Sequence, residues 1–223
     1  MLAESALELV PKEIRNRPAV LSDSKRRGKG ASEILLDRSF HHSAMAKLRD
    51  SEKRGRPDLV HVALLSVTGT PLYAEGRVRA FVHTYDGLVL EIAEKTRIPK
   101  NYIRFRGLME EALLERPKQG LIRLHSMGIK ELVGMVSSDE VYGLSVQGKT
   151  MSPEELAKMV IGSKNPSVIV GGFPHGHFST ETLSVLDHLV RIDAKPLEAH
   201  VVASRVVYEL EKAAAGSTIK SAH

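Results

Sequence analysis

The last third of the chain alternates strand-like and helix-like segments, and no other feature constrains the fold as strongly. Val141–Val146 (VYGLSV) and Val168–Val170 are apolar and β-branched enough to predict strands. Between them, Ser152–Glu155 (SPEE) predicts a helix start, because serine caps the first turn and proline suits its first position. We expect Thr180 to cap a second helix, and a final helix over Ala199–Ala215. The apolar face expected for the Thr180 helix consists of Leu183, Leu186, Leu189 and Val190. Such alternation favours an α/β fold with a parallel sheet covered by helices.

The earlier part of the chain predicts further strands. Ser5–Val10 is expected to be the first of them. Leu59–Val67 is apolar on both faces, which is typical of a central strand. Val78–Thr84 and Leu88–Ala93 alternate on either side of Asp-Gly, a dipeptide that favours a hairpin turn. We expect one domain over residues 1–223, with a β-rich extension around residues 70–105.

Composition excludes several classes of site. The 223 residues include no cysteine, which excludes disulfides, thiolate zinc sites and cysteine nucleophiles. No apolar run approaches the roughly 18 residues of a membrane span, and the first residues lack the layout of a signal peptide. These features favour a cytoplasmic location, or a nuclear one (nucleolar in a eukaryote).

Basic residues are concentrated in the first half of the chain. The formal net charge is +5, and residues 131–193 contain more acids than bases. The three basic clusters are Lys25, Arg26, Arg27 and Lys29; Lys47, Arg49, Lys53, Arg54 and Arg56; and Lys95, Arg97, Lys100, Arg104 and Arg106. This asymmetry indicates a surface for a polyanion, and a set of solvated faces is the simpler alternative.

A glycine-rich segment, VIVGGFPHGHF (Val168–Phe178), begins with the strand predicted at Val168–Val170 and continues as a loop. Ligands of parallel sheets bind beyond the carboxyl ends of the strands. Gly171, Gly172 and Gly176 would let a ligand approach the backbone, whose N–H and C=O groups suit an adenine edge or a ribose. The alternative is a tight turn without a ligand. The pattern is neither a dinucleotide fingerprint nor a phosphate-binding loop.

Histidines raise the question of a metal site. His175 and His177 flank Gly176, and His41 and His42 are adjacent in sequence. No pair has the helical i, i+4 spacing, and no acidic cluster accompanies them, so we expect no metal ion.

Two basic segments carry candidate functional side chains. Arg56 and Asp58 flank a proline, and they form either a structural ion pair or an arginine that the aspartate orients toward a phosphate or base. Arg97, Lys100 and Arg104 recur at intervals of three and four, which places them on one face if the stretch is helical or turn-like, as suits a phosphate backbone. The interleaved aromatic residues are Tyr102 and Phe105, which are candidates for base stacking, although a core position suits Phe105 better.

Four segments together resemble one known family. They are LDRSFHHSAM (Leu36–Met45), KRGRPDLVH (Lys53–His61), RIPKNYIRFRGLM (Arg97–Met109) and VGGFPHG (Val170–Gly176). The segments are similar to those of the Emg/Nep ribosome-biogenesis family, the small-subunit rRNA pseudouridine-N1 methyltransferases of the SPOUT superfamily. The resemblance extends from about Ser5 to Ala215, and the chain is more similar to the archaeal branch than to the eukaryotic one.

The resemblance implies a SPOUT fold with a C-terminal trefoil knot, a homodimer, and S-adenosylmethionine as cofactor. It places the cofactor at Leu144, Gly171, Gly176, His177, Phe178, Ile192, Asp193, Ala194, Lys195, Pro196 and Leu197. It assigns RNA contacts to Arg56, Arg97, Lys100 and Arg104, with Asp58 holding Arg56 in place and both residues at the reacting base. Relatives in eukaryotes commonly have arginine where this chain has Lys100, which argues against a bidentate phosphate contact there.

The implied function is methylation of N1 of a pseudouridine in small-subunit ribosomal RNA, within small-subunit biogenesis. The alternative is a non-catalytic rRNA-binding assembly factor that keeps the basic face. A nucleotide- or NAD-dependent enzyme is disfavoured because the dinucleotide fingerprint is absent. At this level the clusters at 25–29 and 47–54 remain open as RNA contacts.

Overall fold

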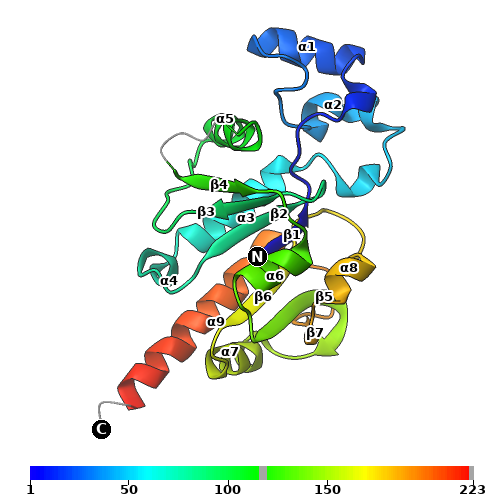
Figure 1. Cartoon of the computed structure of the whole chain (residues 1–223). Coiled ribbons are helices and arrows are strands. Elements are labelled where there is room, and N and C mark those ends of the chain that lie inside the picture. Colours follow the sequence, from blue (N-terminus) through cyan, green and yellow to red (C-terminus); the bar gives the residue numbers. More distant parts are fainter. Residues whose placement is uncertain (116–119, 221–223) are drawn as a thin grey trace.

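Seven strands form a single, mostly parallel sheet at the centre of the molecule (Figure 1). The computed structural model describes residues 1–115 and 120–220. The strands are β1 (Leu2–Ser5), β2 (Ala80–Thr84), β3 (Val89–Ile92), β4 (Ile122–His125), β5 (Glu140–Thr150), β6 (Pro166–Gly171) and β7 (His188–Arg191). Their order is β4-β3-β2-β1-β6-β5-β7. The five neighbouring strands β2, β1, β6, β5 and β7 pair in parallel. Strands β3 and β4 extend the sheet beyond β2 with antiparallel pairing.

Helices cover both faces of this sheet. The α-helices are α1 (Pro18–Arg27), α2 (Arg38–Met45), α3 (Pro57–Thr68), α4 (Pro71–Ala74), α5 (Tyr102–Leu113), α6 (Ile129–Met135), α7 (Pro153–Gly162), α8 (Thr180–Leu183) and α9 (Ala199–Lys220). Two short 3-10 turns, η1 (Lys12–Ile14) and η2 (Ser51–Lys53), precede α1 and α3. The long helix α9 packs against α3 and α7, and α6 packs against α8 (Figure 1).

Alternating side chains of the strands divide the core into two layers, because successive residues of a strand point to opposite faces. Leu2, Val82 and Val170 pack with α3, α5, α7 and α9 on one face. Ala3 and Ile169 pack with α6 on the other face. A third, smaller core lies within the lobe of α1 and α2, at the upper end of the molecule in Figure 1. The sheet therefore holds the glycine segment at its centre, while the α1–α2 lobe stands beyond one end.

Several expectations are confirmed. The α/β class and the parallel sheet are present, and the hairpin forms β2 and β3. Ser152 caps α7 in a capping box with Glu155, as the SPEE pattern predicts. The final helix begins at Ala199 and continues past residue 215 to Lys220. The trefoil threading and the division into a domain with an extension stay predictions.

The strand predicted at Leu59–Val67 is wrong, because these residues belong to helix α3. The helix begins with Pro57 at its first position and Asp58 in its first turn. These are start signals for a helix, since proline needs no N–H there and an acid suits the positive end. The segment is apolar nearly all round because α3 packs against α5, α9 and β2.

Two other boundaries also differ from the prediction. The first strand is Leu2–Ser5, so only Ser5 of the predicted Ser5–Val10 strand belongs to it, and residues 6–10 contribute only an isolated bridge between Leu9 and Leu35. Helix α8 ends at Leu183, and Ser179 caps it in place of the predicted Thr180. Leu189 and Val190, predicted on that helix, belong to strand β7 and pair with β5. Their spacing suits a helix, but the backbone N–H and C=O groups gain partners in the sheet instead.

Candidate active site

The glycine segment leaves the carboxyl end of β6 and turns directly over β1. Ala6 N donates to Gly172 O at 2.8 Å, and Gly172 N donates to Ala3 O at 2.8 Å. A Cβ atom at Gly172 would lie 2.2 Å from Ser5 Oγ, so only glycine permits this approach. The segment is thus fixed to the central strand before it reaches the pocket.

A pocket of about 160 Å³ lies where the middle of β5, at the irregularity that begins after Leu144, meets the loops that follow β6 and β7. Ten of the eleven positions expected to bind the cofactor line it: Leu144, Gly171, Gly176, His177, Phe178, Ile192, Asp193, Lys195, Pro196 and Leu197. Ala194 belongs to the same loop and is exposed. Residues from distant parts of the sequence are therefore brought to one cavity, at the edge where parallel sheets bind ligands.

A larger cavity, of about 520 Å³, lies elsewhere in the molecule. Its walls include Met1, Ala80 and Pro166, which lie at the amino-terminal ends of β1, β2 and β6. Size alone would favour this cavity as the ligand site. Its position at the wrong ends of the parallel strands favours the smaller pocket.

The smaller pocket combines apolar walls with backbone groups and one fixed carboxylate. Leu59 and Val190 contribute apolar surface. Asp193 accepts hydrogen bonds from Lys195 N at 3.0 Å and from Arg205 Nη1 at 2.8 Å. These bonds, first that from Lys195, lower the pKa of Asp193 and keep it ionised. Such a pocket suits a ligand with a flat apolar part and polar edges.

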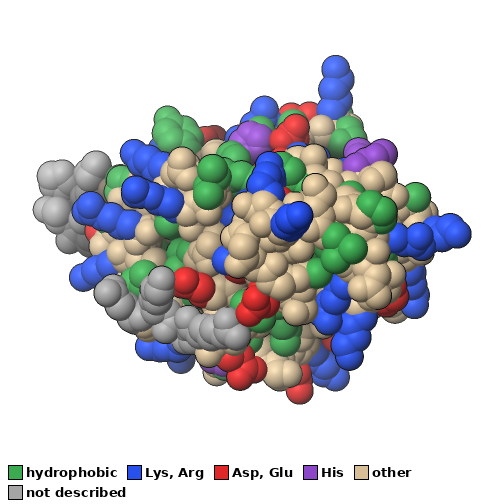
Figure 2. Space-filling view, turned by 90° about the horizontal axis from the view of Figure 1, so that it is seen from above, with side chains coloured by type: hydrophobic (Ala, Val, Ile, Leu, Met, Phe, Trp, Pro, Cys, Tyr) green, Lys and Arg blue, Asp and Glu red, His purple; other side chains and the backbone are tan. Residues whose placement is uncertain are grey.

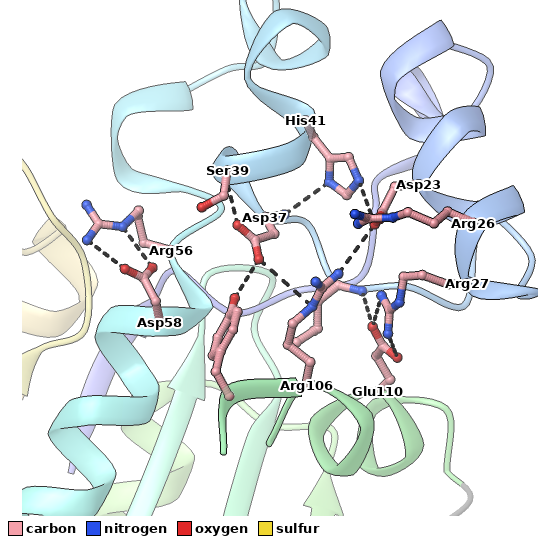
Figure 3. Close-up of polar contacts among 12 residues, drawn as sticks. Asp23, Arg26, Arg27, Asp37, Ser39, His41, Arg56, Asp58, Arg106 and Glu110 are labelled. Atoms are coloured by element: carbon pink, nitrogen blue, oxygen red, sulfur yellow. Dashed lines mark hydrogen bonds and ion pairs between the residues drawn. The ribbon is translucent and has the colours of Figure 1, made fainter. Parts of the chain in front are cut away.

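Arg56 and Asp58 form a bidentate ion pair beside this pocket, with Nε–Oδ1 and Nη2–Oδ2 distances of 2.8 and 2.9 Å (Figure 3). Arg56 caps α3, and its backbone N donates to Ala6 O at 3.0 Å. The hydrogen bonds that Arg56 donates to Asp58 raise the pKa of Arg56, so the guanidinium stays charged. The next residue, Leu59, lines the pocket. With side-chain exposures of 36% and 47%, both members of the pair remain accessible to a ligand.

Arg97, Lys100 and Arg104 are all exposed, the first two before α5 and Arg104 in its first turn. The stretch is helical only from Tyr102 onward, with Asn101 as cap, so Arg97 and Lys100 precede the helix. Among the residues that the structure describes, no carboxylate lies within 4.0 Å of these three cations. Their charges are therefore available to a polyanion.

The two aromatic side chains of this segment point inward. Phe105 is completely buried, which confirms the core position predicted for it. His61 stacks on its ring with centroids 4.3 Å apart. The Tyr102 hydroxyl donates to Asp37 Oδ2 at 2.5 Å. Stacking of an RNA base on Phe105 is excluded by its burial.

Several basic residues of the clusters are committed to internal ion pairs (Figure 3). Arg27 makes two hydrogen bonds to Glu110, of 2.6 and 2.7 Å, and Lys29 adds a third at 2.6 Å. Arg54 binds both carboxylate oxygens of Glu8, at 2.7 and 2.6 Å. Glu110 is completely buried, so these cations neutralise acids of the interior and are not free to bind RNA.

Arg106 belongs to the same internal network. It is 5% exposed, approaches Asp23 Oδ2 at 3.4 Å, and lies over the rings of Phe40 and Tyr102. His41, fully buried nearby, lies 3.4 Å from the same Asp23 oxygen. The network joins the α1–α2 lobe to α5 (Figure 3). Lys and Arg side chains are nevertheless scattered over the face seen in Figure 2.

Comparison with known proteins agrees with this geometry. The family model described as EMG1/NEP1 methyltransferase matches residues 1–211. The chain belongs to the EMG1/NEP1 methyltransferase family.

Relatives in this family match along nearly the whole chain. The ribosomal RNA small subunit methyltransferase Nep1 of Staphylothermus marinus is 41% identical over 216 residues, which cover 95% of this chain and 94% of the relative. Nep1 of Thermococcus sibiricus is 42% identical over 215 residues, covering 95% and 96%. The crystal structure of Archaeoglobus fulgidus Nep1 bound to S-adenosylhomocysteine has a TM-score of 0.84 and 37% identity, covering 96% of this chain and 97% of that one. The resemblance inferred from the four sequence segments is therefore confirmed.

Sequence reasoning missed part of the pocket of this EMG1/NEP1 family member. Leu59, Phe173, Val190, Ala199 and Val202 also line it. Leu59 could not be placed at the pocket because its segment is predicted to be a strand. Ala199 and Val202 could have been placed there, because they lie at the predicted start of the last helix, directly after the Ile192–Leu197 loop. Within residues 1–115 and 120–220, no group of three or more His, Asp or Glu side chains could hold a metal ion. No helix among the described residues is long and apolar enough to cross a membrane.

Proposed function

We propose that this chain transfers the methyl group of S-adenosylmethionine to N1 of a pseudouridine in small-subunit ribosomal RNA. The observation that carries the proposal is the adjacency of the loop pocket and the Arg56–Asp58 pair, which meet at Leu59. One side suits a cofactor and the other suits an RNA base. Membership of the EMG1/NEP1 methyltransferase family and the S-adenosylhomocysteine complex of a relative support the choice of cofactor.

The pocket fits the cofactor by the chemistry of its walls. The segment Gly171–Phe178 and the loop Ile192–Leu197 would present backbone N–H and C=O groups to the adenine and ribose, while Leu144 and Leu59 supply apolar contact. His177 would contribute backbone atoms, since its side chain is exposed in a loop without a metal cluster. S-adenosylmethionine supplies an already activated methyl group on its sulfonium.

Pseudouridine explains why an arginine is needed beside the pocket. Its base is attached through carbon, so N1 carries a proton that uridine lacks. Methylation forms the N1–CH₃ bond, breaks the S–CH₃ bond, and releases the N1 proton to water. Arg56 would stabilise the negative charge that develops on the base. Asp58 holds Arg56 through two hydrogen bonds, and this occupied carboxylate is better suited to orientation than to proton removal.

The remaining RNA would be bound by the exposed cations Arg97, Lys100 and Arg104. Arginine offers bidentate hydrogen bonds to a phosphate, whereas Lys100 acts as a point charge. The target base must lie in a loop or leave its stack to reach the pocket. We also propose that the protein acts as a homodimer within small-subunit assembly.

Two assays test this function against its alternatives. Calorimetry with S-adenosylhomocysteine, and with NAD as a control, should show binding of the first compound only; binding of NAD alone would indicate a different class of α/β enzyme. Labelled S-adenosylmethionine should pass its methyl group to an RNA hairpin that contains pseudouridine. Tight RNA binding without any transfer would favour a non-catalytic assembly factor.

A further inference from the structure

Lys53 belongs to the second basic cluster by sequence, yet its side chain points into the glycine segment. Its Nζ donates to Glu4 Oε2 at 3.0 Å and also to the carbonyl oxygen of His177. The same ammonium lies 4.5 Å from the centroid of the Phe173 ring. Only 17% of the Lys53 side chain is exposed. An RNA phosphate would have to displace all three partners to use this charge.

Glu4 completes the contact from the central strand. Its second carboxylate oxygen, Oε1, accepts a hydrogen bond from Ser179 N at 2.7 Å, just after the glycine segment. Burial tends to raise the pKa of Glu4, but hydrogen bonds from Ser179, Thr182 and Lys53 together lower it, so the carboxylate is ionised. Glu4 also has φ = +50°, a left-handed conformation that is uncommon for a residue with a side chain. Such backbone strain is concentrated at functional sites, where the surrounding structure maintains it.

Gly176 shows how closely Lys53 approaches the loop. This glycine has φ = +97°, and a Cβ atom built on it would lie 2.8 Å from Lys53 Cε. Gly176, His177 and Phe173 all line the cofactor pocket. The Lys53–Glu4 pair therefore contacts the segment at Phe173 and His177, on both sides of Gly176, and contacts Ser179 directly after it.

We propose that Lys53 and Glu4 are positioning residues that hold the cofactor loop in its binding shape, and that Lys53 is not an RNA contact. The inference rests on the proposed function, because it treats the Gly171–Phe178 segment as part of the cofactor site. A loop with several flexible glycines loses conformational freedom when it binds a ligand. A buried, charge-assisted contact that fixes the loop beforehand reduces that loss and so raises cofactor affinity.

The test uses the full-length variants Lys53→Met and Glu4→Gln, with Lys47→Met as a matched control. Lys47 is an exposed lysine of the same cluster. By calorimetry, each positioning variant should bind S-adenosylhomocysteine about tenfold more weakly, the effect expected for loss of a hydrogen bond to a charged group. Lys47→Met should leave this affinity unchanged. In the methyl-transfer assay the KM for S-adenosylmethionine should rise while kcat at saturating cofactor is retained.

Measurements of RNA binding decide whether Lys53 positions the cofactor loop or contacts RNA. We expect RNA affinity, and its dependence on salt, to be the same for Lys53→Met as for the wild type. A fall in RNA affinity with a shallower salt dependence, and unchanged cofactor affinity, would overturn the proposal and make Lys53 a phosphate contact. Unchanged affinities for both ligands would overturn it as well. If Lys53→Met fails to fold, the nearly isosteric Glu4→Gln carries the test. Failure of the wild type itself to bind S-adenosylhomocysteine would contradict the proposed function instead.

Discussion

The proposed cofactor pocket and the basic surface are built in opposite ways. The pocket is lined by the middle of β5 and by the loops that follow β6 and β7, and ten of eleven expected positions meet there. The basic surface contains only some members of the three basic clusters, because other members are paired with buried acids. Arg97, Lys100 and Arg104 are exposed, whereas Arg27, Lys29, Arg54 and Arg106 are bound to acids of the interior.

This contrast shows which parts of a site are encoded locally. A glycine after a buried strand is placed by its own strand, so the sequence order is enough to locate a pocket. Whether an arginine is free depends on acids elsewhere in the chain. Glu110 is 83 residues from Arg27, and Glu8 is 46 residues from Arg54. Charge clustering in sequence therefore overestimates the surface available to RNA.

The largest expected effect comes from a change at Arg56, which lies between the pocket and the basic surface. Arg56→Ala should lower kcat/KM for methyl transfer by about 10²–10³-fold, because it removes a group that stabilises charge at the reacting base. RNA binding should weaken, and S-adenosylhomocysteine binding should be retained. Calorimetry with each ligand measures the two affinities. An equal loss of cofactor affinity would show that the division between the pocket and the basic surface is wrong.

The next effect tests the backbone of the pocket. Gly172→Ala should lower the free energy of unfolding by about 2–3 kcal/mol and weaken cofactor binding, since the added methyl group overlaps Ser5 and the neighbouring backbone. Gly162→Ala is the control, because no atom lies within 4 Å of a Cβ at that position. Urea unfolding of both variants provides the measurement. Equal stability of the two would show that the segment is not fixed against β1.

A third comparison sets an exposed arginine against an internal one. Arg104→Ala should weaken RNA binding by about 1 kcal/mol and reduce the salt dependence by about one phosphate contact, with no change in stability. Arg27→Ala should instead lower stability by about 2 kcal/mol, because Glu110 is left buried with fewer partners. Filter binding over a salt series and thermal unfolding measure the two effects. If Arg27→Ala reduced the salt dependence of RNA binding at unchanged stability, its internal assignment would be contradicted.

The smallest effect concerns pH and the network joining the α1–α2 lobe to α5. Burial lowers the pKa of His41 below its ordinary value of 6.5. Below pH 6.5 the unfolded chain therefore binds a proton at this residue more readily than the folded protein does, and stability falls as the pH falls. His41→Gln should lose less stability than the wild type between about pH 6.5 and about pH 5, by about 1 kcal/mol or less. His83, whose pKa is also lowered by burial, is present in both proteins. Parallel pH profiles from denaturant unfolding would contradict the neutral state of His41.

Local signals account for the parts of the fold that were predicted correctly. The capping box at Ser152 and the Asp-Gly turn of the hairpin involve only neighbouring residues, so tertiary packing does not change them. The strand prediction for Leu59–Val67 is wrong because a helix buried on most sides has no polar face, so its sequence lacks the 3.6-residue alternation that identifies a helix. The helix prediction for Leu189 and Val190 is wrong for the opposite reason: their spacing suits a helix, but their backbone pairs with β5. The positions of Arg56, Asp58 and the cofactor loops came with the family resemblance, and the structure brings them to one place.

The central claim is that the pocket delivers a methyl group to N1 of pseudouridine. The most direct measurement compares two RNA hairpins of one sequence, one containing pseudouridine and the other uridine at the target position, each incubated with labelled S-adenosylmethionine and digested to nucleosides. We expect N1-methylpseudouridine from the first hairpin and no label in the second, since uridine has no N1 proton to replace. Equal labelling of both hairpins, or no labelling of a tightly bound pseudouridine hairpin, would contradict the claim.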